Sequence, residues 1–316
     1  MEKNLIVKMA NGFGNQMFLY ASAYAFSKKL NYNLLIDDET GVLHDLKKWK
    51  KRKRLNWTPK YELDVFTLSS KIADNKFKFL NSFDYLNRKY LKLIDKFMSK
   101  KNFLMENLDK NKNTFYSGHY LTQSYRNNIF LEGYFESEKY FKDFREDLIK
   151  EFSLKSSPKF YNNIFKKMID NSNVVSIAFR SNRFTETDKD STDIQMQKKT
   201  FDFEHKVVKY IYRGIDFFKS KIDNPKFLIW SDNFTNLQKY FDPNSFTFVE
   251  NNSNDKILLD FFLMCQCKYF IVGPTSFHWW PAWLCNHKDK FVVCPKDSEL
   301  NISSNNDFWP ESWIKI

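Results

Sequence analysis

The chain has 316 residues, of which 42% are hydrophobic and 18% are aromatic, and its formal net charge is +12. This length and apolar content predict a folded protein with more than one core, because single cores stop growing near 250–300 residues. No low-complexity tract or fixed-period repeat is present. The most apolar stretch, at 257–273, contains Asp260, Gln266 and Lys268 and therefore does not predict a membrane span.

Much of the positive charge lies at 47–54, KKWKKRKR, where seven of eight residues are basic. A solvated loop and a peripheral contact with an anionic membrane, with Trp49 and Trp57 as interfacial anchors, are equally compatible with this pattern. No nucleic-acid-binding motif accompanies the patch, so we do not expect nucleic acid as a partner.

The amino-terminal segment MEKNLIVKMANG holds no apolar run long enough for a secretory signal, which predicts a cytoplasmic protein, on the inner membrane if the basic patch binds lipid. The four cysteines are then expected to be reduced, buried thiols. Two of them, Cys265 and Cys267, would point to nearly opposite sides of a helix. Although His278 and His287 lie nearby, we therefore expect no zinc site.

The first half of the chain opens with a βαβ pattern. The apolar run at 4–10 predicts a buried strand, 15–31 a helix and 33–37 a second strand. Residues 40–130 are basic and aromatic and give no clear strand order. A further strand is predicted at 129–135, and a helix over 137–152 with Ser137 as its cap.

The second half alternates helical patterns with short apolar runs. A helix is predicted to begin near Pro158, and the seam between two domains to lie between Glu151 and Pro158. The five apolar runs stand at 173–180, 226–232, 245–250, 268–273 and 290–294. This alternation predicts a second parallel, doubly wound sheet and an α/β fold.

The loop after the first strand carries Gly12 and Gly14, the first two glycines of a G-x-G-x-x-G fingerprint. Asp37 closes the second strand, where a ribose-binding acid stands in NAD enzymes. However, Met17 occupies the third glycine position. The loop alone is therefore compatible with a dinucleotide site, a nucleotide-sugar site or a tight turn.

The residues that follow, Asn15 and Gln16, place amides at a helix start, where backbone N–H groups and the helix dipole favour anions. The same amides would also serve as helix caps in the tight turn. They therefore do not separate the three interpretations.

Three segments together resemble the bacterial α-1,2-fucosyltransferases of glycosyltransferase family 11: GFGNQMFLYASA, LEGYFESEKYF and LMCQCKYFIVGPTSFHWWPAWL. They follow the family's order across nearly the whole chain. The resemblance implies a GT-B fold, with two Rossmann-like domains facing across a cleft. It implies that residues 1–155, with their basic and aromatic insertion, face the acceptor and that 156–316 bind the donor.

The resemblance also implies an inverting transfer of L-fucose, or a related deoxysugar, from a GDP-sugar to a β-galactoside of a surface glycan such as an O-antigen, carried on a lipid. It implies no metal and no other cofactor. The same fold with another donor, and a non-catalytic protein that binds nucleotide or glycan, remain alternatives.

The implied donor site draws on both halves of the chain. Its residues are Gly12, Gly14, Asn15, Gln16, Arg180, Asp232, Thr275, Ser276 and Phe277. Thr275 and Ser276 start a helix after a strand, where hydroxyl and N–H groups suit a diphosphate without a cation. Asp232 ends a strand, a place suited to a base or ribose. Trp279, Trp280 and Trp283 are expected to pack in the core rather than stack on a sugar.

Arg180 matches the first arginine of the family's H-x-R-R-G-D-Y motif, which the resemblance assigns to the donor phosphates. A guanidinium suits this role because it offers a charged, bidentate fork. The rest of the motif differs: Ala178 replaces the histidine, Ser181 the second arginine, Asn182 the glycine and Arg183 the aspartate. These changes leave the donor sugar open.

The acceptor hydroxyl needs a general base within reach, and a carboxylate or histidine is required for it. The loop after Arg180 offers Glu186, Asp188, Asp190 and Asp193, of which Glu186 and Asp188 are our catalytic candidates. Residues 188–190 also spell D-x-D, a metal–diphosphate signature. They do not directly follow a strand, so we expect no metal there.

Overall fold

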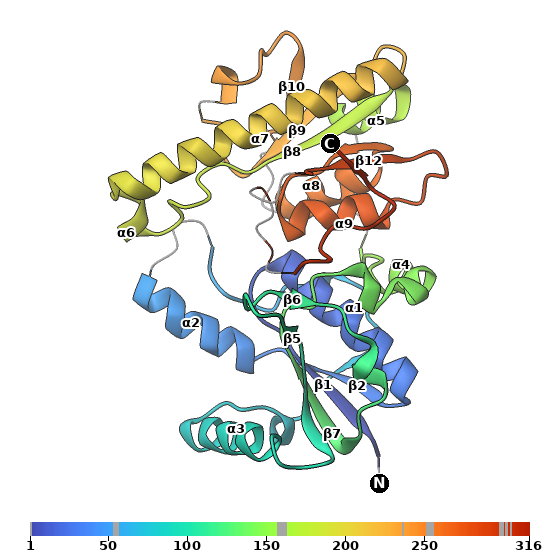
Figure 1. Ribbon diagram of the computed structural model, residues 1–316. Coiled ribbons are helices and arrows are strands. Elements are labelled where there is room, and N and C mark those ends of the chain that lie inside the picture. Colours follow the sequence, from blue (N-terminus) through green and yellow to red (C-terminus); the bar gives the residue numbers. More distant parts are fainter. Residues whose placement is uncertain are drawn as a thin grey trace. The chain divides into compact units, whose positions relative to one another are not determined.

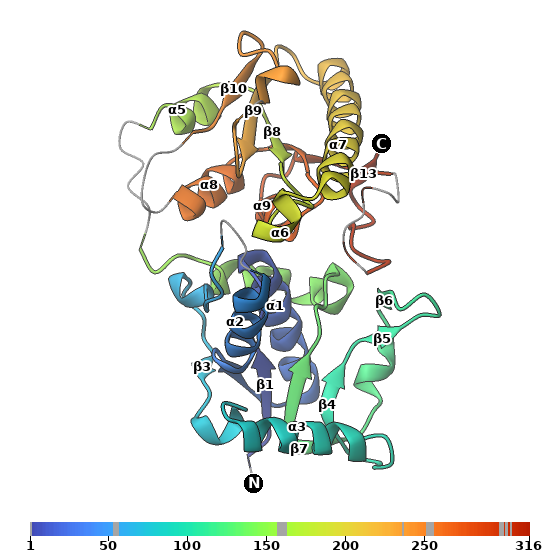
Figure 2. The same ribbon diagram turned by 90° about the vertical axis from the view of Figure 1, so that its left-hand side faces the viewer.

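The computed structural model describes residues 2–52, 57–156, 163–235, 237–250, 256–296, 300, 303 and 305–316. These residues form two compact units (Figures 1 and 2). The first unit holds 2–52, 57–156, 303 and 305–310, and the second holds 163–235, 237–250, 256–296, 300 and 311–316. Residues 303 and 305–310 thus pack with the first unit although they lie near the end of the chain.

The first unit is built on a five-stranded sheet in the order β3-β2-β1-β7-β4. Its strands are β1 (Asn4–Lys8), β2 (Asn33–Asp37), β3 (Lys71–Ile72), β4 (Lys101–Met105) and β7 (Tyr125–Glu132). All neighbouring pairs in this sheet are parallel. The predicted βαβ unit is confirmed, with β1 at the centre of the sheet.

Helix α1 (Phe13–Leu30) joins β1 to β2. Its side chains from Phe13 to Ser27 are almost all buried, as expected of a helix that is apolar on every side. Gly12 is its N-cap, so the helix begins two residues before the predicted start at Asn15. At the other end, Asn31 adopts a left-handed φ of 59° and donates its N–H to the carbonyl of Lys28.

Short elements surround this sheet, and those between residues 40 and 130 fill the part of the chain that gave no clear strand order. The helices are α2 (Thr40–Arg52), α3 (Ser82–Ile94) and α4 (Arg145–Glu151), with 3₁₀ turns η1 (Leu63–Val65), η2 (Asn75–Phe77), η3 (Gly118–Leu121), η4 (Glu138–Tyr140) and η5 (Lys142–Phe144). A small antiparallel pair, β5 (Asn107–Leu108) and β6 (Thr114–Phe115), completes this unit.

The predicted helix over 137–152 is wrong in its first half. Ser137 caps only the 3₁₀ turn η4, and a regular helix starts at Arg145. The reason is tertiary packing, because Tyr140 and Phe141 turn into the core, where Tyr140 contacts Phe135 at 5.1 Å and Phe141 contacts Phe18 at 6.1 Å between ring centroids. Similarly, β7 ends at Glu132, before the predicted strand end, and Phe135 has a φ of 52°.

The second unit contains a six-stranded sheet, and all five predicted strands are confirmed in it. They are β8 (Val174–Phe179), β9 (Lys226–Ser231), β10 (Phe246–Phe248), β11 (Tyr269–Ile271) and β12 (Phe291–Cys294). All neighbours pair in parallel. The sixth strand, β13 (Ile314–Lys315), has only two residues and gives no sequence signal.

The helices of this unit are α5 (Ile164–Asn171), α6 (Asp188–Ser191), α7 (Ile194–Lys221), α8 (Lys256–Cys265) and α9 (Ser276–Leu284), with the 3₁₀ turn η6 (Leu237–Lys239). Asn163 caps α5, and the predicted start near Pro158 lies outside the described residues. Figure 2 shows α7 along one face of the sheet and α8 and α9 on the other side. Ile177 of β8 and Ile211 of α7 belong to the main core of this unit.

The order of strands in the second sheet is β10-β9-β8-β11-β12-β13. From β8 the sheet therefore continues through β9 and β10 on one side and through β11, β12 and β13 on the other. In open α/β sheets, ligands bind at the carboxyl ends of the strands where the order reverses. This rule directs attention to the residues that follow β8 and β11.

Candidate functional site

Two chain segments meet at the carboxyl ends of β8 and β11. Arg180 directly follows β8, and Gly273 follows β11. A Cβ atom on Gly273 would lie 2.5 Å from the carbonyl oxygen of Ala178, so only glycine permits this close approach. The approach holds the start of α9 beside the end of β8.

Helix α9 begins three residues after Gly273, so its first turn lies next to this junction. Thr275 is the N-cap, and its hydroxyl accepts the N–H of His278 at 3.2 Å. Ser276 opens the helix, and the ring of Phe277 packs on Phe261 of α8 at 5.6 Å. A helix start of this kind attracts anions through its N–H groups and its dipole.

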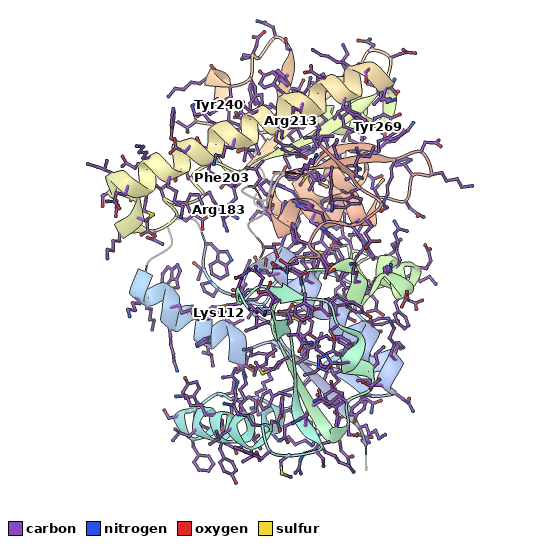
Figure 3. The ribbon with its side chains drawn as sticks, viewed as in Figure 1. Lys112, Arg183, Phe203, Arg213, Tyr240 and Tyr269 are labelled. Carbon is purple, nitrogen blue, oxygen red and sulfur yellow. The ribbon has the colours of Figure 1, made fainter. Side chains whose placement is uncertain are left out.

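Arg180 is held by a carboxylate in the turn after β8. Its Nη2 lies 2.5 Å from Oε1 of Glu186, and Nη1 of Arg183 lies 3.5 Å from the same oxygen. The exposed fractions of the side chains are 31% for Arg180, 18% for Glu186 and 25% for Arg183. Figure 3 shows Arg183 below the amino-terminal half of α7, the helix that carries Phe203. The inverted charge at 183 is thus balanced by Glu186.

The backbone of this turn explains one departure from the family motif. Asn182 has a φ of 56°, the left-handed region that glycine and asparagine adopt most readily. Its carbonyl accepts the N–H of Thr185 at 3.1 Å, and its own N–H donates to Glu204 at 3.1 Å. Asparagine and glycine, the residue of the motif, both adopt this left-handed conformation readily, so the turn is compatible with either.

His278 is a residue of this site that the sequence suggested only as a zinc ligand. Its Nδ1 is buried and has no hydrogen-bond partner among the described residues, and a Cβ atom on Gly273 would lie 3.1 Å from it. Burial, and secondarily the charge of Arg180, lower the pKa of His278 to about 3, so the imidazole is neutral at pH 7.

The sequence did contain a signal for His278. Ala178 stands where the family has its strand histidine, and the segment TSFHWWPAWL resembles a family pattern S-S-F-S-W-W-x-A-W-L, in which serine stands at the position of His278. A Cβ atom on Gly273 would lie 2.5 Å from the carbonyl oxygen of Ala178 and 3.1 Å from Nδ1 of His278, so both residues lie close to this glycine.

Asp232 lies one residue beyond β9, the strand next to β8. It is exposed, and its Oδ1 accepts the N–H of Ser181 at 3.1 Å and the Ser181 hydroxyl at 3.3 Å. The end of the second strand is the usual place of a ribose-binding acid in a Rossmann-like sheet. Asp232 and Arg180 are therefore brought to the same edge.

Two of the acidic residues in the loop after Arg180 form hydrogen bonds at the starts of helices α6 and α7. Asp190 accepts the hydroxyl of Thr187 at 2.6 Å, and Asp193 caps α7 by accepting the N–H of Gln195 at 2.8 Å. The side chain of Asp188 lies outside the described residues. Glu186 is thus the loop carboxylate that the structure places directly against Arg180.

Neither cysteines nor acids form a metal-type cluster in the described part of the chain: no group of three or more His, Cys, Asp or Glu side chains is found there. All four cysteines are free thiols. The expected packing role of the tryptophans is confirmed, since Trp279 and Trp283 are buried and stack at 5.9 Å between ring centroids.

In the first unit, the glycine-rich loop is tied to its surroundings by Gln16. Its Nε2 donates to the carbonyls of Asn11 and Lys60, both at 2.8 Å, and its Oε1 accepts the N–H of Glu62 at 2.9 Å. The amide of Gln16 therefore anchors the loop. By contrast, a Cβ atom on Gly12 would make only ordinary contacts, at 3.8 Å or more, so packing within this unit does not demand glycine there.

The side chain of Asp37 has a structural role within the first unit and does not face an open ligand site. The side chain is buried, and its Oδ1 accepts the N–H groups of Glu39 and Thr40 at the start of α2. Burial raises the pKa of Asp37. The carboxylate that the dinucleotide hypothesis needs is therefore already used as a helix cap.

The basic patch belongs to α2 as far as it is described. Lys47, Lys48, Lys50 and Lys51 are exposed there, whereas residues 53 and 54 lie outside the described residues. None of the helices in the described part of the chain combines the length and the apolar character needed to cross a bilayer.

Comparison with known proteins identifies relatives over nearly the whole chain. The model of glycosyl transferase family 11 matches residues 78–316. An α-1,2-colitosyltransferase of Escherichia coli is 25% identical over 328 residues, covering 99% of this chain and 98% of that protein. The Escherichia coli O-antigen biosynthesis glycosyltransferase WbnK is 26% identical over 325 residues, covering 98% of this chain and 99% of that protein.

Among solved structures, the NodZ α-1,6-fucosyltransferase, known from Bradyrhizobium, matches in crystals soaked with GDP-fucose. It has a TM-score of 0.50 and 13% identity, covering 92% of this chain and 97% of that one. This likeness concerns the fold, and it agrees with an α/β fold of the GT-B type built on two parallel sheets.

Proposed function

This chain belongs to glycosyl transferase family 11 and is a glycosyltransferase, and we therefore propose that it transfers a 6-deoxy sugar from a GDP-sugar to a galactoside hydroxyl with inversion. The observation that carries the proposal is the junction of β8 and β11. There, Arg180 and the start of α9 lie at the edge where the strand order reverses.

The donor diphosphate is assigned to Arg180 and to the first turn of α9. Guanidinium and helix-start N–H groups together neutralise the charge that grows on the leaving diphosphate. Each such group contributes about 3 kcal/mol if it acts like a donor in an oxyanion hole. Asp232 then reaches the ribose or base, and Ser276 and Phe277 lie beside the diphosphate. No metal is needed for this arrangement.

In the proposed reaction, the acceptor hydroxyl attacks the anomeric carbon while the bond from that carbon to the diphosphate oxygen breaks and GDP leaves. Glu186 takes the hydroxyl proton. Without donor, its carboxylate is paired with Arg180 at 2.5 Å. A diphosphate competes for that guanidinium, and by displacing Glu186 it makes the carboxylate available to the acceptor.

Both 6-deoxy donors remain within the proposal. Fucose and colitose differ by the hydroxyl at C3, and the relatives include proteins named for each sugar. The neutral His278 lies close to Gly273 at the end of β11, at a position where the family pattern has serine. An imidazole there changes the shape and hydrogen-bonding of the pocket, which supports a second candidate, the same reaction with another GDP-deoxysugar.

We assign the acceptor to a lipid-linked surface glycan of the O-antigen type, by likeness to WbnK. The exposed lysines of α2 fit attachment to the anionic membrane that carries such a glycan. Protein with Lys47, Lys48, Lys50 and Lys51 changed to glutamine should then bind anionic vesicles less tightly. If the variant and the wild-type protein bind these vesicles equally well at low salt, the lysines of α2 do not attach the protein to the membrane.

The test is calorimetric titration of the purified protein with GDP, UDP, GDP-fucose, GDP-colitose and NAD, first with EDTA and then with Mn²⁺. The expected result is binding of GDP and of at least one GDP-deoxysugar in EDTA. If GDP binds but neither GDP-fucose nor GDP-colitose does, the donor is a different GDP-sugar. Binding only with Mn²⁺, or no binding of guanine nucleotides, would overturn it.

A further inference from the structure

Helix α3 presents its apolar side chains to solvent. The exposed fractions are 78% for Phe83, 62% for Leu86, 60% for Tyr90 and 55% for Leu93, and Phe97, just beyond the helix, is 83% exposed. Within α3, all of which is described, no side chain is buried. Single exposed apolar residues are common, but the spacing of three and four residues makes these five one continuous stripe.

The opposite side of α3 is charged and faces its own unit. Arg88 Nε donates to Glu132 Oε1 at 2.6 Å, and Lys92 Nζ donates to Glu132 Oε2 at 2.6 Å. Asp95, at the helix end, accepts the N–H of Asn102 at 2.9 Å. At about 100° per residue, these contacts lie on the side of the helix opposite to the stripe.

Glu132 fixes this orientation. Its side chain is only 5% exposed and also lies 3.4 Å from Lys8. Burial alone would raise the pKa of Glu132, but hydrogen bonds from Arg88 and the charges of Lys8 and Lys92 lower it to about 2. Turning the stripe inward would leave this buried carboxylate without its partners, a heavy cost. The apolar side therefore points outward in the stable fold.

Helix α3 does not depend on burial of the stripe for its formation. Asn81 accepts the N–H of Asp84 at 2.9 Å, and Asp84 accepts the N–H of Asn81, which makes a complete capping box. The stripe is thus displayed on a formed helix rather than exposed by local unfolding.

We propose that α3 is an interfacial helix whose stripe inserts into the surface of an anionic lipid bilayer. Lys89, Lys96 and Lys100 are exposed beside the stripe, and Lys89 lies over the ring of Tyr85 at 4.6 Å. Apolar and aromatic residues flanked by lysine are the pattern of helices that lie in a membrane interface. Figures 1 and 2 place α2, with its exposed lysines, on the same side of the first unit as α3.

A bilayer fits this face better than a second copy of the chain. A symmetric pairing would bring the flanking lysines of both copies together, in a protein of net charge +12. An anionic membrane surface, by contrast, attracts each of the lysines that flank the stripe.

The test uses the full chain and vesicles of phosphatidylethanolamine with phosphatidylglycerol, with phosphatidylcholine vesicles for comparison. The variant Leu86→Glu/Leu93→Glu adds charge to outward positions and leaves the contacts of Glu132 intact. Its matched control is Ile194→Glu/Phe201→Glu on α7, where the exposed fractions are 80% and 56%. We expect the α3 variant to lose cosedimentation by about tenfold or more, and the α7 variant to keep it.

Two further readouts separate the outcomes. Hydrogen exchange of the wild-type protein should slow at 83–97 when anionic vesicles are added, and light scattering should give a monomer as concentration rises. Equal vesicle binding by both variants, or a dimer that only the α3 variant abolishes, would overturn the proposal. Because bare lipid is the probe, this result is independent of the donor and acceptor proposed above.

Discussion

Arg180 and Glu186 form an ion pair with 2.5 Å between Nη2 and Oε1, so the guanidinium proposed to bind diphosphate is occupied by a carboxylate when no donor is bound. Both side chains lie at the carboxyl edge of β8. Donor binding then becomes an exchange of one anion for another at Arg180, and each partner makes a different prediction.

Replacement of Arg180 by alanine should lower kcat by about a hundredfold to a thousandfold, because a charged donor to the leaving group is lost. The melting temperature should change little, since Arg180 is 31% exposed. The matched control is Arg183→Ala, which removes a second guanidinium facing the same Glu186 oxygen at 3.5 Å. If kcat falls equally in both variants, the effect of Arg180 comes from the net positive charge of the site and not from a specific contact with the diphosphate.

The Glu186→Gln variant should separate binding from turnover. Without the competing carboxylate, Arg180 is free for the diphosphate, and GDP should bind more tightly in calorimetry. Turnover should nevertheless fall by about a hundredfold or more, because the group that takes the acceptor proton is lost. A variant with wild-type kcat would show that Glu186 only balances the charge of Arg180.

His278 should make the folded protein sensitive to acid. The pKa of His278 is about 3 in the folded chain, below the 6.5 of a free histidine. As pH falls from 6.5 toward 3, the unfolded chain therefore takes up a proton that the folded chain does not, and stability is lost at about 1 kcal/mol per pH unit.

Urea unfolding of the wild type and of His278→Ser, at pH 7 and pH 5, measures this effect. The free energy of unfolding should fall more steeply with acid in the wild type. Staying at or above pH 5 avoids the titration of Glu132. Identical slopes in the two proteins would mean that His278 is protonated in the folded state as well.

Replacement of Glu132 by glutamine should destabilise the protein by about 3 kcal/mol, because Lys8, Arg88 and Lys92 lose their shared partner. The pKa of Glu132 is about 2, below its ordinary 4.5. Its contribution is therefore complete above pH 4.5 and is lost as pH falls toward 2, and the variant should lack this loss.

The matched control for Glu132 is Glu106→Gln. Burial raises the pKa of Glu106, and its carboxylate accepts the N–H of Tyr134 at 2.6 Å, a bond that glutamine can keep. Chemical denaturation should show a cost of about 1 kcal/mol or less for this change. A similar cost at both positions would contradict the special role of the cations around Glu132.

Local composition was enough to predict most strands of the two sheets, and neighbouring residues were enough to indicate the family. Apolar runs such as 33–37 and 226–232 lie in parallel sheets that are covered by helices, so their composition alone identifies them. The family segments are likewise read along the chain, because their residues are neighbours in sequence. The same local logic failed over 137–152, where aromatic packing breaks the helix.

Which side chains meet is a property of the folded chain alone. Gln16 hydrogen-bonds to the backbone of Lys60 and Glu62, and His278 lies close to Gly273 at the end of β11. Arg88 holds α3 with its apolar side outward by binding Glu132, 44 residues away. Local periodicity shows that α3 has an apolar side but not where it points. The side that faces the sheet is set by the contacts of the buried Glu132 with Lys8, Arg88 and Lys92, which come together only after the chain has folded.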